Sequence, residues 1–337
     1  MNINNNLKNN NLIDNFNRTI DYLRISITDR CNLRCQYCMS EPFQKNTLHK
    51  DILRYEEILQ IVNASVEIGI SKVRVTGGEP LVRKDITNFL SQLCEIKPLR
   101  DVSLTTNGVL LKRYLDDIKN AGINRLNISL DTLIKEKFKS ITGFNYWDDV
   151  WEGIQMAREM GFSPIKINVV VMKGFNDNEI IDFGKLSISQ PFAIRFIEYM
   201  PFGKDKKSSN YFMPGFEIIK KLESIDSLVP VDVKNNKQLH EGPARRFKWE
   251  NGQGEIGIIS PISNHFCHSC NRLRLTANGK LRPCLLSDYE VDLKEALRQN
   301  FSTNKIKDLF KTAISKKKLK HNIENYVVHS KMSSIGG

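Results

Sequence analysis

The chain has 337 residues, of which 40% are hydrophobic, so it can bury a substantial core and its composition excludes wholesale disorder. Lysine and arginine together number 50 against 38 aspartates and glutamates, and this excess of 12 positive charges favours anionic partners such as phosphates, nucleic acid or acidic proteins. The longest apolar runs fall short of the roughly 18 residues that a membrane helix needs, so the sequence predicts no membrane span.

The first 17 residues are rich in asparagine, and their composition is typical of a flexible N-terminal tail. They contain neither the apolar core of a secretion signal nor an arginine-rich amphipathic pattern. The whole chain has seven cysteines, an odd number, which favours a reducing compartment, so we expect a cytoplasmic protein. In that setting clustered cysteines bind metal more often than they form disulfides.

From residue 18 to about residue 230, short β-branched runs alternate with longer amphipathic segments. This alternation indicates right-handed βαβ units and a parallel sheet. Six such units predict an α/β fold with a partial (β/α)6 barrel resembling a TIM barrel; a doubly wound open sheet is the alternative. The predicted strands are residues 23–27, 72–78, 102–108, 125–131, 165–172 and 194–200. The predicted helices are residues 55–69, 85–96, 111–122, 147–161 and 176–186.

Three cysteines, Cys31, Cys35 and Cys38, follow the first predicted strand within eight residues. A structural zinc site uses four closed ligands, but the nearest following histidine, His49, is 11 residues past Cys38. Three thiolates at short spacing are typical of an iron–sulfur cluster that leaves one iron open. A zinc knuckle with a distant fourth ligand is the alternative.

Polar motifs mark the ends of four further predicted strands. They are "GGEP" (77–80), "TTNG" (105–108), "SLD" (129–131) and "EYMP" (198–201). Each motif alone suits an ordinary turn, because glycine, threonine, asparagine and proline favour turns. Parallel strands, however, end on one face of a barrel, which is where barrel enzymes place their active sites. We therefore expect these motifs to surround the first three cysteines.

The C-terminal region, residues 231–337, contains a second cysteine set formed by Cys267, Cys270 and Cys284. His265 or His268 could complete a zinc site, so the spacing alone leaves zinc and iron–sulfur open. Arg272 and Arg274, two residues apart, are placed to share one face of a strand. Two arginines beside a metal site suit an anionic or hydrogen-bonding substrate.

The first cysteine loop, with Tyr37 before its last cysteine, resembles the signature of radical S-adenosylmethionine enzymes, and "GGEP" resembles their methionine-binding motif. From about residue 18 to the end, the chain is similar to the GTP 3′,8-cyclase family of molybdenum cofactor biosynthesis. The motifs that fit this family are "DRCNLRCQYCM", "RVTGGEPLVR", "LTTNG", "NISLDT", "FIEYMPFG", "HFCHSCNRLRLTANGKLRPCL" and a terminal "GG".

The resemblance implies two [4Fe-4S] clusters, one on each cysteine set, and S-adenosylmethionine as cofactor. It implies that S-adenosylmethionine is bound by Tyr37, Gly78, Ser129 and Met200. It implies that GTP is bound by Arg24, Arg74, Thr105, Lys166, Arg272, Leu273 and Arg274. It further implies that the C-terminal glycines reach the active site, so that the catalytic residues are Arg272, Arg274, Gly336 and Gly337.

The implied reaction begins when a 5′-deoxyadenosyl radical removes hydrogen from C3′ of GTP. The C3′ radical then adds to C8 of guanine, and reduction and protonation give (8S)-3′,8-cyclo-7,8-dihydroguanosine 5′-triphosphate. The resemblance implies that cyclic pyranopterin monophosphate synthase takes the product, that a reducing electron donor serves the clusters, and that the chain can form a homodimer. It implies neither a nucleic-acid nor a membrane partner.

Two other functions fit parts of the sequence. A radical enzyme that modifies a peptide would use the second cluster as an electron relay, but arginines in a barrel lumen do not favour a peptide. A non-enzymatic zinc and nucleic-acid binder would use the basic C-terminus. Nucleic-acid modules usually interleave aromatic with basic residues, and "SKKKLKH" (315–321) has no aromatic residue besides its histidine.

Overall fold

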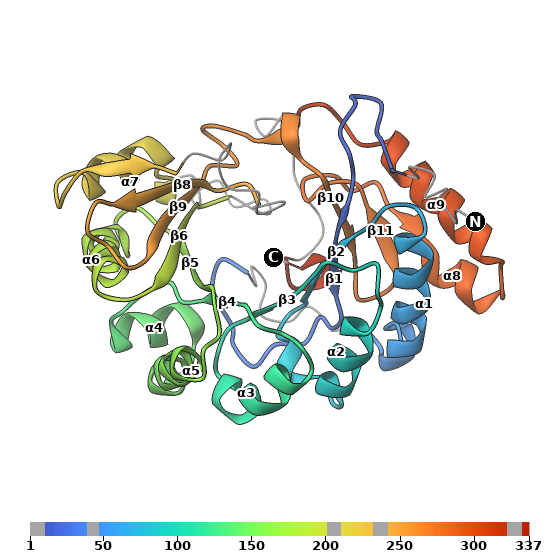
Figure 1. The fold of residues 1–337 in the computed structure, drawn as a ribbon, viewed down its shortest axis with the longest axis horizontal. Coiled ribbons are helices and arrows are strands. Elements are labelled where there is room, and N and C mark those ends of the chain that lie inside the picture. The colour runs from blue at the N-terminus through green and yellow to red at the C-terminus, as the bar shows by residue number, and fades with distance from the viewer. Residues whose placement is uncertain (1–10, 39–46, 201–209, 232–241, 322–331, 337) are drawn as a thin grey trace, which may run out of the picture.

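The structure is a computed structural model that describes residues 11–38, 47–200, 210–231, 242–321 and 332–336. A single 12-stranded sheet curves around a lumen, and most of the helices lie outside it (Figure 1). The strand order is β12-β11-β10-β1-β2-β3-β4-β5-β6-β9-β8-β7. The order β1 to β6 runs without reversal, which excludes the doubly wound alternative and confirms the α/β partial barrel.

All six predicted strands are present, and they pair in parallel in chain order. Their bounds are β1 (Tyr22–Ser26), β2 (Lys72–Thr76), β3 (Asp101–Thr106), β4 (Leu126–Ser129), β5 (Ile165–Val171) and β6 (Phe192–Glu198).

The last third of the chain extends this sheet at both edges. Strand β10 (Arg272–Leu275) adds in parallel to β1, and β9 (Glu255–Ile259) adds in parallel to β6. Antiparallel strands follow on each side: β11 (Lys280–Arg282) and β12 (Val291–Asp292) beyond β10, and β8 (Arg245–Trp249) and β7 (Leu228–Pro230) beyond β9. Among the described residues β7 and β12 do not pair, so the barrel stays open. The division at residue 230 remains a prediction.

The five predicted helices are all present, as α1 (Tyr55–Val66), α2 (Ile86–Cys94), α3 (Leu111–Asn120), α5 (Trp147–Glu159) and α6 (Ile180–Ser189). Five more complete the described part of the chain: α4 (Lys135–Thr142), α7 (Gly215–Leu222), α8 (Leu293–Arg298), α9 (Thr303–Ser315) and α10 (Met332–Ile335). Short 3-10 turns lie at His49–Asp51, Pro80–Val82, Asp177–Glu179 and Cys267–Ser269. No helix in the described ranges is long and apolar enough to cross a membrane.

Strand alternation divides the sheet into an apolar outer face and a polar inner face. In β1, Leu23 and Ile25 belong to the hydrophobic core beneath the helices, whereas Tyr22 and Arg24 line the lumen. Burying aliphatic side chains under helices stabilises the fold by about 1.5–3 kcal/mol for each Leu or Ile that leaves water. The inner face is therefore free to hold polar groups.

The C-terminal helix α10 lies inside the ring of strands, where it contacts β1 (Figure 1). Ile335 is only 1% exposed there. Gly336 follows with φ +74°, and a Cβ at this residue would lie 2.5 Å from Cγ2 of Thr76. Only glycine meets both conditions without strain. Residues 332–336 therefore lie within the lumen rather than on the surface; Gly337 lies outside the described residues.

Candidate active site

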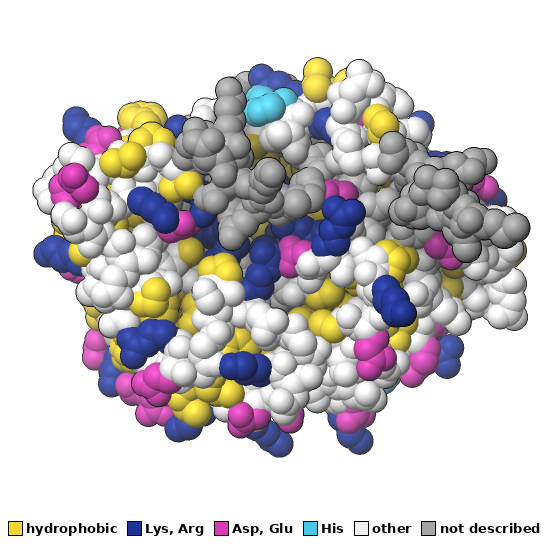
Figure 2. Space-filling view, in the orientation of Figure 1, with side chains coloured by type: hydrophobic (Ala, Val, Ile, Leu, Met, Phe, Trp, Pro, Cys, Tyr) yellow, Lys and Arg dark blue, Asp and Glu magenta, His cyan; other side chains and the backbone are white. Residues whose placement is uncertain are grey.

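A cavity of about 330 Å³ occupies the lumen, and both cysteine sets open into it. Figure 2 shows lysine and arginine side chains gathered in the hollow at the centre of this face. The motifs predicted at the carboxyl ends of the strands meet here, because the cavity is lined by Gly78, Thr105, Ser129 and Met200. One end of the cavity is therefore built from the first cysteine loop and these motifs, and the second cysteine set faces the same space.

The first cysteine set lies in an electrostatically negative environment. Burial raises the pKa of Cys38 to about 12, with the other cysteine Cys31 and then Asp131 adding to the effect. Burial followed by Asp131 also raises the pKa of Cys35 well above its usual value. Asp131 accepts a hydrogen bond from the Tyr37 hydroxyl at 2.7 Å, which ties the cysteine loop to the end of β4.

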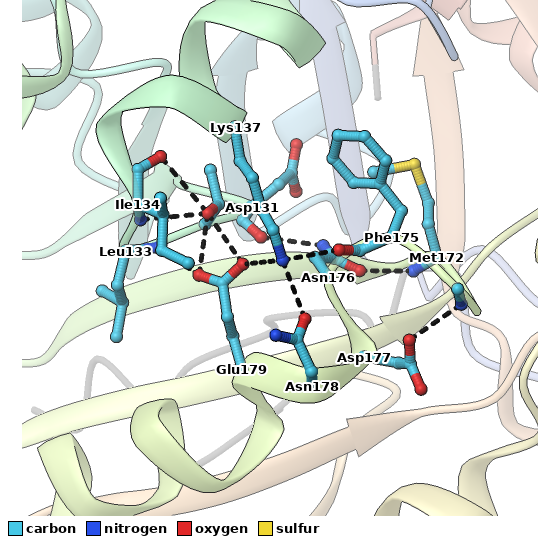
Figure 3. Close-up of polar contacts among 12 residues, drawn as sticks. Asp131, Leu133, Ile134, Lys137, Met172, Phe175, Asn176, Asp177, Asn178 and Glu179 are labelled. Atoms are coloured by element: carbon cyan, nitrogen blue, oxygen red, sulfur yellow. Dashed lines mark hydrogen bonds and ion pairs between the residues drawn. The ribbon is translucent and has the colours of Figure 1, made fainter.

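Asp131 is itself held by a network of buried polar groups between β4, β5 and α6 (Figure 3). Asn176 donates to the carbonyl oxygens of Asp131 (2.7 Å) and Val170 (2.9 Å) and accepts from Met172 N (2.7 Å). The Glu179 carboxylate accepts from Thr132 Oγ1, from the backbone of Leu133 and, at 3.0 Å, from Lys137 Nζ. Because these groups are buried and bonded, they fix the loop that orients Tyr37.

The "GGEP" motif packs closely on the first cysteine loop. A Cβ at Gly78 would lie 2.2 Å from the carbonyl oxygen of Arg30, so this contact requires glycine. Glu79 is buried, and its carboxylate accepts from Thr106 Oγ1 at 2.8 Å and from Asn107 N and Leu81 N. Burial raises the pKa of Glu79 to about 7. These hydrogen bonds join the carboxyl ends of β2 and β3 beside the first cysteine loop.

The second cysteine set lies in a positive environment. Burial alone would raise the pKa of Cys270, but Arg272 and Lys317 outweigh it and lower the pKa to about 6. Lys317 Nζ lies 3.4 Å from Cys270 Sγ, within hydrogen-bonding distance of sulfur. His321 Nδ1 lies 3.0 Å from Cys267 Sγ, so the histidine against this set is His321, whereas the sequence drew attention to His265 and His268.

Each set offers three free thiols, the donor type that holds an iron–sulfur cluster. Within the described ranges, no three His, Cys, Asp or Glu side chains gather as ligands of one metal ion. A zinc ion needs its ligands at about 2.0–2.3 Å around one point. Each thiolate of a four-iron cluster instead binds a different iron, so its cysteines stand further apart. All six cysteines nevertheless face one cavity.

Between the two cysteine sets, the strand register places three arginines side by side. Arg24 is paired with Arg274 on one side and with Arg74 on the other. Neighbouring strands are about 4.8 Å apart, so these cations repel one another. Burial and then Arg274 lower the pKa of Arg24 well below its usual value. An anion placed here would relieve both the burial and the repulsion.

The positive electrostatic field of these arginines extends to the neighbouring strands. Burial and then Arg74 lower the pKa of Arg195 to about 9, and burial and then Arg195 lower that of Lys166 to about 6. In the lumen, the Tyr22 hydroxyl and Thr105 Oγ1 have no hydrogen-bond partner among the described residues. Buried polar atoms of this kind are rare unless a ligand or water meets them. The inner face therefore suits a polar, polyanionic ligand.

The residues implied for GTP do not all line the cavity. Arg24, Arg74, Thr105, Arg272 and Arg274 line it. Lys166 is buried beside the lining residues, at the register level of Asn127 and Ala193. The Leu273 side chain belongs to the hydrophobic core, so only its backbone faces its neighbours in the sheet.

The C-terminal tail meets Arg274. The guanidinium of Arg274 donates to the carbonyl oxygen of Gly336 and lies 3.5 Å from that of Ile335. Both partners are backbone atoms, so the tail contributes acceptors and no charge of its own at these positions. Its residues thereby orient an arginine of the lumen.

Sequence reasoning missed several residues of the site. Arg195 lines the cavity, and its signal was available because it is the one charge within the apolar run "FAIRFI". Lys317 belongs to the basic segment "SKKKLKH", which the sequence led us to consider only for nucleic-acid binding. Its signal is its spacing from Phe310, Ala313 and Ile314, which continues the buried face of α9 just beyond the end of the helix.

Comparison with known proteins identifies the two parts of the chain. A model of the "Radical SAM superfamily" matches residues 25–186, and a model named "Molybdenum Cofactor Synthesis C" matches residues 192–323. The GTP 3′,8-cyclase of Thermodesulfovibrio yellowstonii is 49% identical over 96% of this chain and 99% of its own length. Those of Petrotoga mobilis and Moorella thermoacetica are 45% and 46% identical over 97% and 96% of this chain, and 100% and 99% of their own lengths.

Solved structures share the fold at lower identity. Streptococcus suis SuiB bound to S-adenosylmethionine superposes with a TM-score of 0.58 at 17% identity, covering 84% of this chain and 66% of that one. SuiB bound to its precursor peptide SuiA gives 0.57 at 17% identity, covering 92% and 68%. At this identity the likeness shows the fold alone, so it does not revive the peptide-modifying alternative.

Proposed function

The chain belongs to the GTP 3′,8-cyclase family of the radical S-adenosylmethionine superfamily, and from this premise we propose which of its residues perform the reaction. The reaction converts GTP into (8S)-3′,8-cyclo-7,8-dihydroguanosine 5′-triphosphate, the first step of molybdenum cofactor biosynthesis, with S-adenosylmethionine and iron–sulfur clusters. The assignment divides the cavity into two ends with separate tasks.

At the first end, Cys31, Cys35 and Cys38 hold one [4Fe-4S] cluster. When bound, this cluster and S-adenosylmethionine supply the 5′-deoxyadenosyl radical. Tyr37, Gly78, Ser129 and Met200 line this end and are the residues that contact S-adenosylmethionine. The buried network behind Asp131 keeps Tyr37 in one orientation, which limits the loss of rotational freedom on binding.

At the second end, Cys267, Cys270 and Cys284 hold another [4Fe-4S] cluster, whose open iron site would receive the guanine of GTP. Arg274 forms the row with Arg24 and Arg74, and Arg272 lies two residues before Arg274 on the same strand, nearer to Cys270 in the sequence. The triphosphate is held by these cations together with Lys166, because its negative charge is complementary to the positive charge of the row. Thr105 and the Leu273 backbone complete the contacts, and Gly336 keeps Arg274 in place. Gly337 lies outside the described residues, and its catalytic role is a proposal from the family resemblance.

Holding GTP at both ends fixes the ribose between them before a radical exists. The substrate then reacts as part of one assembly, and the entropy of bringing the groups together is lost during binding. Substrate that fills the cavity also leaves less room for water, which protects a radical from side reactions.

The proposal also covers partners. A reducing electron donor serves the clusters, cyclic pyranopterin monophosphate synthase takes the product, and the chain can form a homodimer. A cytoplasmic location suits six unpaired cysteines that must stay reduced to bind iron. No nucleic-acid partner is required, because the positive charge of the lumen is matched by GTP.

The observation that supports this function most directly is the row of buried arginines between two facing cysteine sets. The test is anaerobic reconstitution followed by iron analysis and product assay. We expect about eight irons per chain, as two four-iron clusters require. We also expect 5′-deoxyadenosine and the cyclised nucleotide to form from S-adenosylmethionine and GTP. Zinc in place of iron, or 5′-deoxyadenosine without any cyclised nucleotide, would contradict the proposal.

A further inference from the structure

Lys317 is the buried member of a lysine run at the end of α9. It is 4% exposed, whereas Lys316 and Lys318 on either side are exposed. Burying a lysine ammonium is costly unless charge or hydrogen bonds compensate for the lost water. The burial of the Lys317 ammonium therefore calls for compensating contacts inside the protein.

The ammonium of Lys317 bonds to three separate segments of the second cysteine site. It lies 3.4 Å from Cys270 Sγ, 2.9 Å from the carbonyl oxygen of Arg272 and 2.8 Å from that of Pro283. An ammonium has three N–H donors, so these contacts use all of them. Pro283 immediately precedes Cys284. One side chain thus joins the turn that bears Cys270, the strand that bears Arg272 and the segment that bears Cys284.

The partners of Lys317 differ from those of the buried Lys72 and the half-buried Lys137. Lys72 forms an ion pair with Asp101 at 3.0 Å, and Lys137 forms one with Glu179 at 3.0 Å. Lys317 instead donates hydrogen bonds to two neutral carbonyl oxygens and one sulfur. The group that can carry negative charge among them is therefore the Cys270 thiolate.

From this geometry we infer that Lys317 is a positioning residue of the second cluster. Lys317 raises the reduction potential of that cluster and fixes the distance between the cluster and Arg272. The inference rests on the proposed function, since it needs a cluster on the second cysteine set. Positive charge and an N–H donor at a cluster sulfur stabilise the reduced form, which is the more negative one. The bond to the Arg272 carbonyl places the GTP-binding arginine relative to the same sulfur.

The experiment isolates the second cluster by using the full chain with Cys31, Cys35 and Cys38 all changed to alanine. This background should retain about four irons per chain. In it, Lys317→Met removes the charge and donors at similar length, Lys317→Arg keeps both, and Lys316→Met removes one charge from the exposed neighbour. The readouts are iron content and the midpoint potential from an anaerobic titration followed by electron paramagnetic resonance.

We expect Lys317→Met to lower the equilibrium constant for reducing the second cluster about tenfold, which is about 59 mV for one electron. Lys316→Met should leave the midpoint unchanged, and Lys317→Arg should stay closer to the background than Lys317→Met. The same midpoint in Lys317→Met and the background, or equal shifts in Lys317→Met and Lys316→Met, would overturn the inference.

If Lys317→Met loses the cluster, the Lys317→Arg variant shows whether the loss comes from the missing charge and donors. A cluster kept in Lys317→Arg but lost in Lys317→Met supports the inference, because charge and donors are then what the site needs. Loss in both variants overturns it. If the background itself binds no iron, the proposed second cluster is wrong, and that failure is separate from any effect of Lys317.

Discussion

The two cysteine sets contain the same three thiols but stand in opposite electrostatic surroundings. The first lies near Asp131 and Glu79, and burial and neighbouring negative groups raise the pKa values of its cysteines. The second lies near Arg272 and Lys317, which lower the pKa of Cys270, whereas burial raises the pKa of Cys267. Negative surroundings lower the reduction potential of a cluster, and positive surroundings raise it. We therefore expect a cluster on the first set to have the lower reduction potential of the two.

The sets also differ in how the fold holds them. The first is fixed by neighbouring strand ends through buried neutral and acidic groups. The second set is fixed by residues from near the beginning and near the end of the sequence. Arg18 donates to the carbonyl oxygens of Cys267 at 2.5 Å and Lys318 at 3.0 Å, and its guanidinium pairs with buried Asp14 at 2.6 Å. Lys317 reaches the same site from α9. Changes that affect one set should therefore spare the other.

The largest contrast is expected from single cysteine changes. Cys35→Ala should abolish S-adenosylmethionine cleavage, because the cluster that supplies the electron is lost. Cys270→Ala should keep uncoupled cleavage but abolish cyclisation. Each variant should retain about four of eight irons, as loss of one four-iron cluster requires. Cleavage at the wild-type rate in Cys35→Ala, measured as 5′-deoxyadenosine under anaerobic reduction, would break the assignment.

Arginine changes sharpen the contrast at the second end. Arg272→Ala or Arg274→Ala should lower GTP affinity about 10- to 100-fold, since each removes charge-assisted hydrogen bonds of about 1.5–3 kcal/mol. Uncoupled S-adenosylmethionine cleavage should persist. Equilibrium GTP binding and both product yields provide the measurement. Lys112→Ala, which removes an exposed cation outside the lumen, is the control. Equal loss of both activities would mean that the arginines support the fold instead.

Deleting Gly336 and Gly337 should reduce cyclisation about tenfold or more, because Arg274 loses a charge-assisted hydrogen bond worth about 1.5–3 kcal/mol. Iron content and the thermal midpoint should stay close to those of the intact chain, because Ile335 keeps its buried position. The comparison is with a chain extended by one alanine after Gly337. Wild-type cyclisation by the truncated chain would show that the tail has no catalytic role.

Asn176→Ala should increase local mobility only at the end of the cavity that carries the first cysteine set. It removes three buried hydrogen bonds, at a local cost on the order of 2 kcal/mol after relaxation. Hydrogen exchange at the amides of Val170 and Met172 should become roughly ten times faster, while exchange around Cys270 stays unchanged. Asn63→Ala, which removes one exposed hydrogen bond, is the matched control. Equally faster hydrogen exchange around both cysteine sets would show that the two sets are not held independently.

The smallest effect concerns Lys166 and pH. Burial and nearby cations lower its pKa to about 6, so in the empty cavity Lys166 is mostly neutral at pH 7.5. A bound triphosphate favours the charged form and raises that pKa, so binding takes up a proton. GTP affinity should therefore fall as the pH rises from 7.5 to 8.5, by at most tenfold. Calorimetry in buffers of different ionisation enthalpy measures the uptake, and Lys166→Met should reduce it by a fraction of one proton.

Local patterns were enough to predict the six central strands, their five helices and the position of both cysteine sets. Helix α4 was missed because Phe138 and Ile141 give it only a short apolar face. The edge strands were missed because their partners are distant in the sequence: β10 pairs with β1 across about 250 residues. The buried roles of Arg18 and Lys317 depend on the same long-range pairing. Arg195, by contrast, had a visible signal and was overlooked.

The sheet described above has both of its outer flanks supplied by residues that follow Leu228. During synthesis, β1 to β6 leave the ribosome first, with the outer edges of β1 and β6 still unpaired. Unpaired apolar edges invite association with other chains. Arrival of β9 and β10 covers both edges and also delivers the second cysteine set and its arginines. A premature stop before residue 255 would therefore leave an aggregation-prone half-barrel rather than a working radical generator.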